Sequence, residues 1–263
     1  MVTRKDYSAI AASKIKKPGQ NPPRVLVYAR NKKGKTRFAS TAEQVLIIDP
    51  EGGADYLPED SADVWPVNTW QDIDEVYNYL KTPEAAEKYK WVAVDGLTRI
   101  NNMAIRYIMK QEEERDLERR PGIIDRRDYG KAGEMMKGLL YNFHALPYGI
   151  IYTAQERMEN PGTSFDEDED IENVEARYVP DLPKGVRGAV NGIVDVIGRL
   201  YTVRVEHPKK EDTMVTVRRL WLAPIEQLDT GGRSQYRLPD YLKNPTIPNL
   251  ISLCLLYTSP SPR

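Results

Sequence analysis

The chain has 263 residues, a net charge of -1 and a hydrophobic share of 40%. This composition is typical of a folded globular protein with one large or two small domains, and it excludes an intrinsically disordered chain. The balanced charge excludes a global basic field, so any contact with nucleic acid must come from local patches. The chain lacks an apolar run of the roughly 20 residues that span a bilayer, and its first residues lack a secretion signal, which predicts a cytoplasmic protein.

Both ends of the chain are expected to lie outside the folded domain. Residues 1–23 are basic and flanked by prolines, which predicts an arm, and 24–250 are predicted to form one domain. Residues 251–263 are predicted to be a disordered tail. Within it, 254–263 (CLLYTSPSPR) resemble the translation of a transposon-type sequencing adapter, and the alternative is a Ser/Pro-rich tail. If the adapter interpretation holds, the genuine chain loses its single cysteine, Cys254, and thiol chemistry is excluded.

Between these ends, strand-like and helix-like segments alternate. Apolar runs at 25–28, 44–49, 91–94 and 148–153 predict strands that are buried on both faces. Residues 36–41 fit the start of a helix, and helical patterns cover 70–80, 97–118 and 129–146. Residues 156–190 are predicted to form a long, partly acidic loop, and 194–205 and 215–223 to form antiparallel strands. The fold class predicted is therefore α/β, with a doubly wound, mostly parallel sheet and late antiparallel strands.

The run ARNKKGKT, residues 29–36, fits the relaxed form of a phosphate-binding loop. A chance match in a chain of this length is on the order of a few per cent, so a basic surface turn is the alternative. The context favours the loop, because the run follows an apolar strand and opens a helix. Alanine can replace the usual first glycine where its φ is negative. The predicted nucleotide-binding residues are Ala29, Arg30, Asn31, Lys32, Lys33, Gly34, Lys35, Thr36 and Arg37.

Three polar residues at the ends of other strands complete a candidate site for hydrolysis. Asp95 ends the strand-like run WVAVD and is predicted to bind magnesium together with Thr36, the alternative being a helix-capping aspartate. Glu51 and Gln155 each follow an apolar strand and are candidates to orient or deprotonate the attacking water, although each could be a solvated loop side chain. Ligands of open α/β sheets bind outside the carboxyl ends of the strands, where these residues would meet.

The order of these motifs resembles the RecA-type ATPase core. It resembles more closely the phage nucleotide-binding proteins related to single-strand annealing recombinases, over roughly residues 24–240. The motifs are ARNKKGKT, DPEGG (49–53), WVAVDG (91–96), DYG (128–130) and IIYTAQE (150–156), followed by VPDLP (179–183) and GIVDVIGR (192–199). The resemblance implies an ATP and magnesium site in which Lys35 binds phosphate and Glu51 is the catalytic carboxylate. Gln155 would sense the γ-phosphate and report it to the following loop.

In RecA-like proteins the loop after that glutamine contacts single-stranded DNA. Here 165–175 are strongly acidic and would repel phosphates. Cations that flank this loop, and a second set of cations before the DYG motif, are the alternative DNA contacts, although such clusters are often only solvated faces. These cations are Arg119, Arg120, Arg126, Arg127, Arg157, Lys184 and Arg187. RecA-like assemblies also take a cation from a neighbouring subunit; Arg233 is a candidate for that role, with a β-turn arginine as the alternative.

The sequence therefore leads to a magnesium-dependent ATPase of phage DNA recombination or annealing that binds single-stranded DNA. It could act as a homo-oligomer and with a phage or host single-strand binding protein. A second hypothesis is a nucleotide-gated switch or loader module with little turnover in phage replication. A third is a small-molecule kinase, for which neither an acceptor pocket nor a lid arginine pair can be located.

Overall fold

The computed structural model describes residues 22–159, 176–207, 213–233 and 238–256. Its centre is a sheet with the strand order β10-β8-β7-β1-β5-β4-β2-β3, in which β6 pairs with β5 and β9 with β7. The strands are β1 (Arg24–Ala29), β2 (Val45–Asp49), β3 (Asp63–Pro66), β4 (Trp91–Asp95), β5 (Gly149–Glu159), β6 (Arg177–Pro180), β7 (Val196–Glu206), β8 (Met214–Trp221), β9 (Gly231–Gly232) and β10 (Tyr241–Lys243). The neighbours from β7 to β3 run parallel, and β8 and β10 are antiparallel additions. The predicted α/β class, with its late antiparallel strands, is confirmed.

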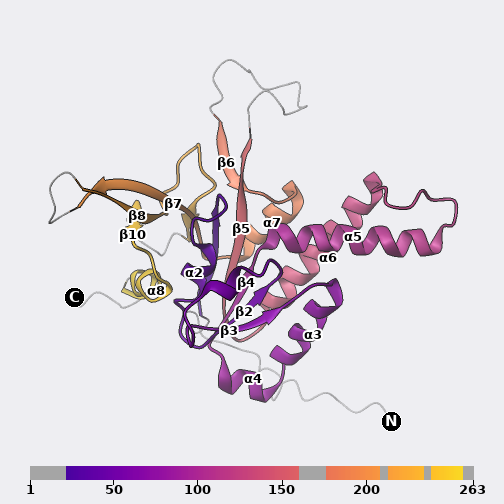
Figure 1. The fold of residues 1–263 in the computed structure, drawn as a ribbon, viewed down its shortest axis with the longest axis horizontal. Coiled ribbons are helices and arrows are strands. Elements are labelled where there is room, and N and C mark those ends of the chain that lie inside the picture. Colours follow the sequence, from indigo (N-terminus) through magenta and orange to yellow (C-terminus); the bar gives the residue numbers. More distant parts are fainter. Residues whose placement is uncertain (1–21, 160–175, 208–212, 234–237, 257–263) are drawn as a thin grey trace, which may run out of the picture.

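Helices cover both faces of this sheet (Figure 1). They are α2 (Lys35–Ala39), α3 (Trp70–Leu80), α4 (Pro83–Lys88), α5 (Leu97–Arg115), α6 (Arg126–His144), α7 (Lys184–Ile193) and α8 (Ile247–Leu256), with a short 3-10 helix η1 (Gly53–Tyr56). Alternate residues of each central strand belong to two different cores. In β1, Leu26 and Tyr28 pack in the core with α3, α5, α6 and α7, whereas Val25 and Val27 pack in the core with α2 and α8. The unbroken apolar runs in the sequence follow from this burial on both faces.

The register of the parallel strands brings their carboxyl ends to one edge. Ala29 of β1 lies opposite Gln155 of β5, and Asp95 of β4 lies opposite Thr153 of β5. The chain passes from β1 by way of α2 to β2, which is three places away in the sheet. Such a change of strand order leaves a crevice outside the carboxyl ends, where ligands bind in open α/β sheets.

Two predictions about loops and ends were wrong. Residues 156–190 are not one long loop, because β5 continues to Glu159, pairs with β6 and is followed by α7. The acidic run within 166–173 lies outside the described residues. The tail predicted from residue 251 is helical up to Leu256, where α8 places Cys254 in the core beside α2. The sequence does indicate this helix, because Ile247, Leu250 and Cys254 are spaced three and four residues apart, as on one face of a helix. Residues 1–21 and 257–263 are not described.

None of the helices in the described parts of the chain is long and apolar enough to cross a membrane.

Among the glycines of the sheet that the structure describes, Gly149, the first residue of β5, leaves the least room for a side chain. A Cβ at this position would lie 2.3 Å from a ring carbon of Trp91 on the neighbouring strand β4. We expect Gly149→Ala to lower the free energy of unfolding by about 1–3 kcal/mol, because a fixed indole ring in a dense core cannot yield to it. Urea unfolding measures the change.

The matched control is Gly138→Ala in α6, where a Cβ would meet nothing within 4 Å. It should raise the free energy of unfolding by about 0.5–1 kcal/mol, as alanine does in a helix. Equal stability of the two variants would contradict the packing described at Gly149.

Candidate functional site

The phosphate-binding loop joins the end of β1 to the start of α2. Ala29 remains in the extended backbone of β1, so the glycine normally found there is not required. The loop turns at two left-handed positions, Lys32 with φ 60° and Gly34 with φ 93°. A left-handed lysine costs roughly 1–2 kcal/mol, so the loop is held in a strained conformation by its surroundings.

A cavity of about 550 Å³ opens at the carboxyl ends of β1, β4 and β5. Of the nine predicted nucleotide-binding residues, Asn31, Lys32, Gly34, Lys35, Thr36 and Arg37 line it. Arg30 instead points to Glu156 of β5, and Lys33 donates from Nζ to Thr202 Oγ1 of β7 at 2.9 Å. These two side chains do not line the cavity, and their contacts hold the loop to the strands beside it, so nucleotide binding by them stays a prediction. Ala29 is fully buried and can contribute only through its backbone.

Lys35 curls over the loop from which it starts. Its Nζ donates to the carbonyl oxygens of Ala29 and Arg30, at 3.2 and 3.4 Å. Burial lowers the pKa of this lysine, and the nearby carboxylates of Asp95 and Glu51 oppose the shift. A partly desolvated ammonium gains strongly from an anionic ligand, which is the role expected of the lysine in a phosphate-binding loop.

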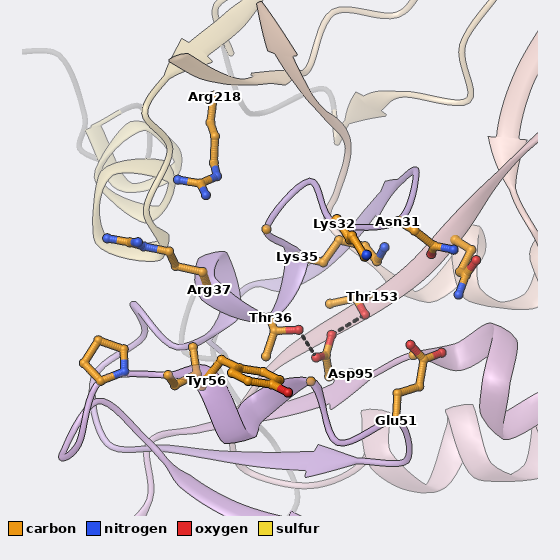
Figure 2. Close-up of a pocket in the computed structure, with 16 residues that line it drawn as sticks. Asn31, Lys32, Lys35, Thr36, Arg37, Glu51, Tyr56, Asp95, Thr153 and Arg218 are labelled. Atoms are coloured by element: carbon orange, nitrogen blue, oxygen red, sulfur yellow. Dashed lines mark hydrogen bonds between the residues drawn. The ribbon is translucent and has the colours of Figure 1, made fainter. Parts of the chain in front are cut away.

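The carboxylate of Asp95 is buried between two hydroxyl groups (Figure 2). Thr36 Oγ1 donates to one carboxylate oxygen at 2.5 Å, and Thr153 Oγ1 donates to the other at 2.6 Å. Burial raises the pKa of Asp95, and the two hydrogen bonds oppose that shift. Thr153 was not identified from the sequence; its signal was its place near the end of the strand next to β4. A buried carboxylate without an ion-pair partner favours a bound cation.

The oxygen atoms of Thr36 and Asp95 fit magnesium. Hydroxyl and carboxylate oxygens are hard ligands, and magnesium in nucleotide sites is held by one or two such residues together with phosphate oxygens and water. Within the described parts of the chain, no group of three histidine, cysteine or acidic side chains could hold a metal by itself. The predicted metal pair is therefore brought together in a geometry that suits a metal–phosphate complex.

Glu51 reaches this site from the turn after β2. Asp49 accepts the N–H groups of Glu51 and Ala54 at 2.9 and 2.7 Å and so fixes the DPEGG turn. Gly96 packs against Glu51, whose Oε1 would lie 3.5 Å from a Cβ at that position. The Glu51 carboxylate lines the cavity on its exposed side, as expected of a group that meets a water molecule.

Gln155 also lines the cavity, and its backbone is fixed by two other elements. Its N–H donates to Thr98 Oγ1 of α5 at 3.0 Å, and its carbonyl accepts the N–H of Asp181 at 2.7 Å. The next residue, Glu156, accepts hydrogen bonds from Arg30 and Arg199. The end of β5 therefore connects the phosphate loop, α5 and β7.

Several cavity residues were not among the predicted site residues. They are Gly53, Tyr56, Leu57 and Pro58 after β2, and Arg218 of β8. Tyr56 is 92% exposed although it lies at the cavity, so its ring is available to a ligand. Arg218 has no signal in the local sequence, because its approach to the loop depends on the β7–β8 pairing.

The cations predicted to contact DNA fall into two groups. Arg119 is corrected: it pairs with the buried carboxylate of Asp128 and donates to the carbonyl of Ile123, so it holds the connection between α5 and α6. Arg157 and Arg187 both pair with Glu159. The remaining cations, Arg120, Arg126, Arg127 and Lys184, are exposed.

Arg233 lies apart from the phosphate site. Its Nε is 2.6 Å from Asp195, just before β7, and it lines a different cavity. Because Asp195 also accepts the backbone N–H of Arg24, the first residue of β1, this pair lies near the strand starts, at the edge opposite to the phosphate loop. Its structural role is thus clear, and a contact with a neighbouring subunit stays a prediction.

The fold and the site define a P-loop protein of the ATPase class. Residues 21–234 match the family described as AAA domain, and the chain belongs to that family. No curated protein matches the chain. Among the solved structures that match is that of the flagellar accessory protein FlaH from Methanocaldococcus jannaschii, with 11% identity over 84% of each chain and a TM-score of 0.38. A likeness this distant does not bear on function.

The site predicts an unusual response to Asp95→Asn. Because the folded state raises the pKa of Asp95, it binds more protons than the unfolded state in and above the ordinary carboxyl range. The wild type therefore loses stability relative to Asp95→Asn as pH rises through that range. Thermal unfolding from pH 4 to 8 measures this difference in stability. An Asp95→Asn variant that is less stable than the wild type by the same amount at every pH would contradict the prediction.

Proposed function

We propose that this protein is a magnesium-dependent ATPase that binds single-stranded DNA and acts in phage DNA recombination or single-strand annealing. The observation that carries the ATPase part is the hydrogen bond from Thr36 to the buried carboxylate of Asp95, with Lys35 on one side and Glu51 and Gln155 at the rim of the same cavity. The AAA domain family supports nucleotide binding and hydrolysis. DNA recombination is supported by the order of the motifs.

Different residues of this chain have different roles in the proposed hydrolysis. Lys35 binds the outer phosphate oxygens, and Thr36 and Asp95 would hold magnesium, which supplies charge neutralisation when it is bound. The exposed carboxylate of Glu51 orients the attacking water and accepts its proton. The ring of Tyr56, which is free of other packing, offers a stacking face to the nucleotide base.

The α5–α6 connection, which we define as residues 116–125 together with the first turn of α6, is the surface that we propose for single-stranded DNA. Arg120, Arg126 and Arg127 are exposed there, and Tyr129 and Leu117 are 52% and 93% exposed. Cations beside an exposed aromatic ring suit the phosphates and bases of a single strand. In Figure 1 this connection projects to the right, away from the sheet.

One helix joins this surface to the nucleotide site. The helix α5 begins two residues after Asp95, and Thr98 in its first turn accepts the N–H of Gln155. Its 19 residues span about 28 Å, at 1.5 Å per residue, to the connection with α6. A change in the position of Gln155 on nucleotide binding would therefore act on the base of the helix that carries the DNA surface.

The first test is ATP hydrolysis by Glu51→Gln. Turnover should fall by about 10²- to 10⁴-fold, because the amide cannot accept the proton of the attacking water. ATP affinity should stay within twofold of the wild type, since Glu51 lies at the rim of the cavity. Steady-state turnover and equilibrium binding of ATP, each with and without single-stranded DNA, give both quantities.

The same measurement separates this proposal from the alternative of a nucleotide-gated switch or loader. A switch would show tight ATP binding, negligible turnover in the wild type and no effect of Glu51→Gln. That outcome would replace the ATPase proposal. Whether the chain acts as a homo-oligomer or with a single-strand binding protein is a separate proposal that rests on the same resemblance.

The second test removes the exposed arginines of the α5–α6 connection in the triple variant Arg120→Gln, Arg126→Gln, Arg127→Gln. Each lost phosphate contact should reduce the slope of log affinity against log salt by about 0.7, so three contacts reduce it by about 2. Fluorescence anisotropy of a labelled single strand at several salt concentrations measures the slope.

The matched control replaces Lys81, Lys88 and Lys90, which lie around α4 near the amino ends of the strands, with glutamine. It removes the same charge and should leave the slope unchanged. An equal effect of the two triple variants would mean that only net charge matters, which contradicts a specific surface.

A further inference from the structure

Arg218 comes from β8, late in the chain, and reaches the phosphate-binding loop. On the paired strands β7 and β8 it lies directly opposite Thr202. Both residues contact the loop at Lys33: Thr202 Oγ1 accepts a hydrogen bond from Lys33 Nζ, and Arg218 Nε donates to the Lys33 carbonyl at 3.3 Å. Thr202 and Arg218, which face each other on β7 and β8, thus both hold Lys33 of the loop in place.

The guanidinium of Arg218 also covers Gly34. A Cβ at that position would lie 2.7 Å from Arg218 Nε, so the loop and the arginine approach closely only because residue 34 is glycine. Gly34 therefore meets two requirements, the left-handed φ of 93° and room for this side chain. None of the ion pairs found in the described parts of the chain occupies Arg218, and it lines the phosphate cavity.

The place of Arg218 along the cavity indicates which part of a nucleotide it meets. Lys35 and the Thr36–Asp95 pair mark the outer phosphates, and Glu51 lies beyond them. Figure 2 shows Arg218 and Arg37 on the opposite side from Glu51. A second cavity of about 290 Å³, lined by Gly34, Arg37 and Arg218, continues in that direction. Arg218 is therefore on the nucleoside side of the phosphate loop.

We propose that Arg218 is a nucleotide-binding residue that contacts an inner phosphate, the part shared by nucleoside diphosphates and triphosphates, and that it acts on the nucleotide bound by its own chain. This inference rests on the proposed nucleotide function and deepens it. The inner-phosphate part of the site is then complete within one chain. Because the arginine faces away from Glu51, it contributes to affinity and not to the transition state of hydrolysis.

The test compares Arg218→Ala with two matched arginine variants. Arg219→Ala changes the next residue, whose guanidinium lies on the other face of β8 over the ring of Tyr241. Arg204→Ala removes a cation from the same face of the β7–β8 pair, farther along β7.

Affinities for ADP and ATP come from displacement of a fluorescent ADP analogue, and turnover is measured at saturating ATP. Circular dichroism and the urea midpoint confirm folding, and Arg218→Gln replaces the alanine variant if that one fails to fold.

We expect Arg218→Ala to weaken the binding of ADP and the binding of ATP to the same degree. The loss should be about tenfold or more, as expected when one hydrogen bond to a charged group is removed. Its kcat should stay within twofold of the wild type, Arg218→Lys should recover part of the affinity, and both control variants should bind like the wild type. Unchanged ADP affinity, or a loss of kcat alone, would overturn the proposal.

Mixing two variants at an ATP concentration far below the Kd of Arg218→Ala, where both turn over slowly, tests whether the arginine acts within its own chain. Arg218→Ala combined with Lys35→Ala should show no more turnover than the sum of the two, because each chain lacks one of its own residues. Recovered turnover would show that Arg218 acts across a subunit contact and would overturn the proposal. If wild type binds neither ADP nor ATP, the proposed function fails with it; if wild type binds and Arg218→Ala binds equally, only this inference fails.

Discussion

The hydrogen bond between Thr36 and Asp95 is the contact on which the rest of the site depends. It joins the first turn of α2 to the end of β4, and Thr153 of β5 completes the environment of the same carboxylate. Burial of this charge is unfavourable by itself, as the raised pKa shows, so the fold retains a local cost that a bound cation would relieve. The sheet order makes this meeting possible, because β5 lies between β1 and β4 and places three strand ends together.

Around this contact the loop is held by ordinary structural interactions. Two of its cations face neighbouring strands: Arg30 pairs with Glu156, and Lys33 contacts Thr202. The crowded charges of the loop thus serve two purposes, since some position the backbone and others, such as Lys35, face the cavity. The missing first glycine is not a defect, because the turn is made farther along at Lys32 and Gly34.

Much of this site could be predicted from local sequence patterns, but not all of it. Strand ends were predictable because an apolar run that stops at a polar residue marks where a buried strand leaves the core, as at Asp95. The direction of the loop side chains was not predictable, because it depends on neighbours such as Glu156 that are distant in sequence. Arg218 was hidden for the same reason: only the register of β7 and β8 brings it to Gly34. The partly helical end of the chain was missed because its composition resembled an adapter sequence, although the spacing of Ile247 and Leu250 was helical.

We propose that the chain binds ATP through a site in which magnesium, Thr36, Asp95 and Lys35 act together. Titration calorimetry of ATP in magnesium and in EDTA, on the wild type and on Lys35→Ala, is the decisive test. We expect saturable binding of one ATP per chain by the wild type in magnesium, with at least tenfold weaker binding in EDTA or in Lys35→Ala. Absence of binding, or binding of equal strength in all these conditions, would contradict it.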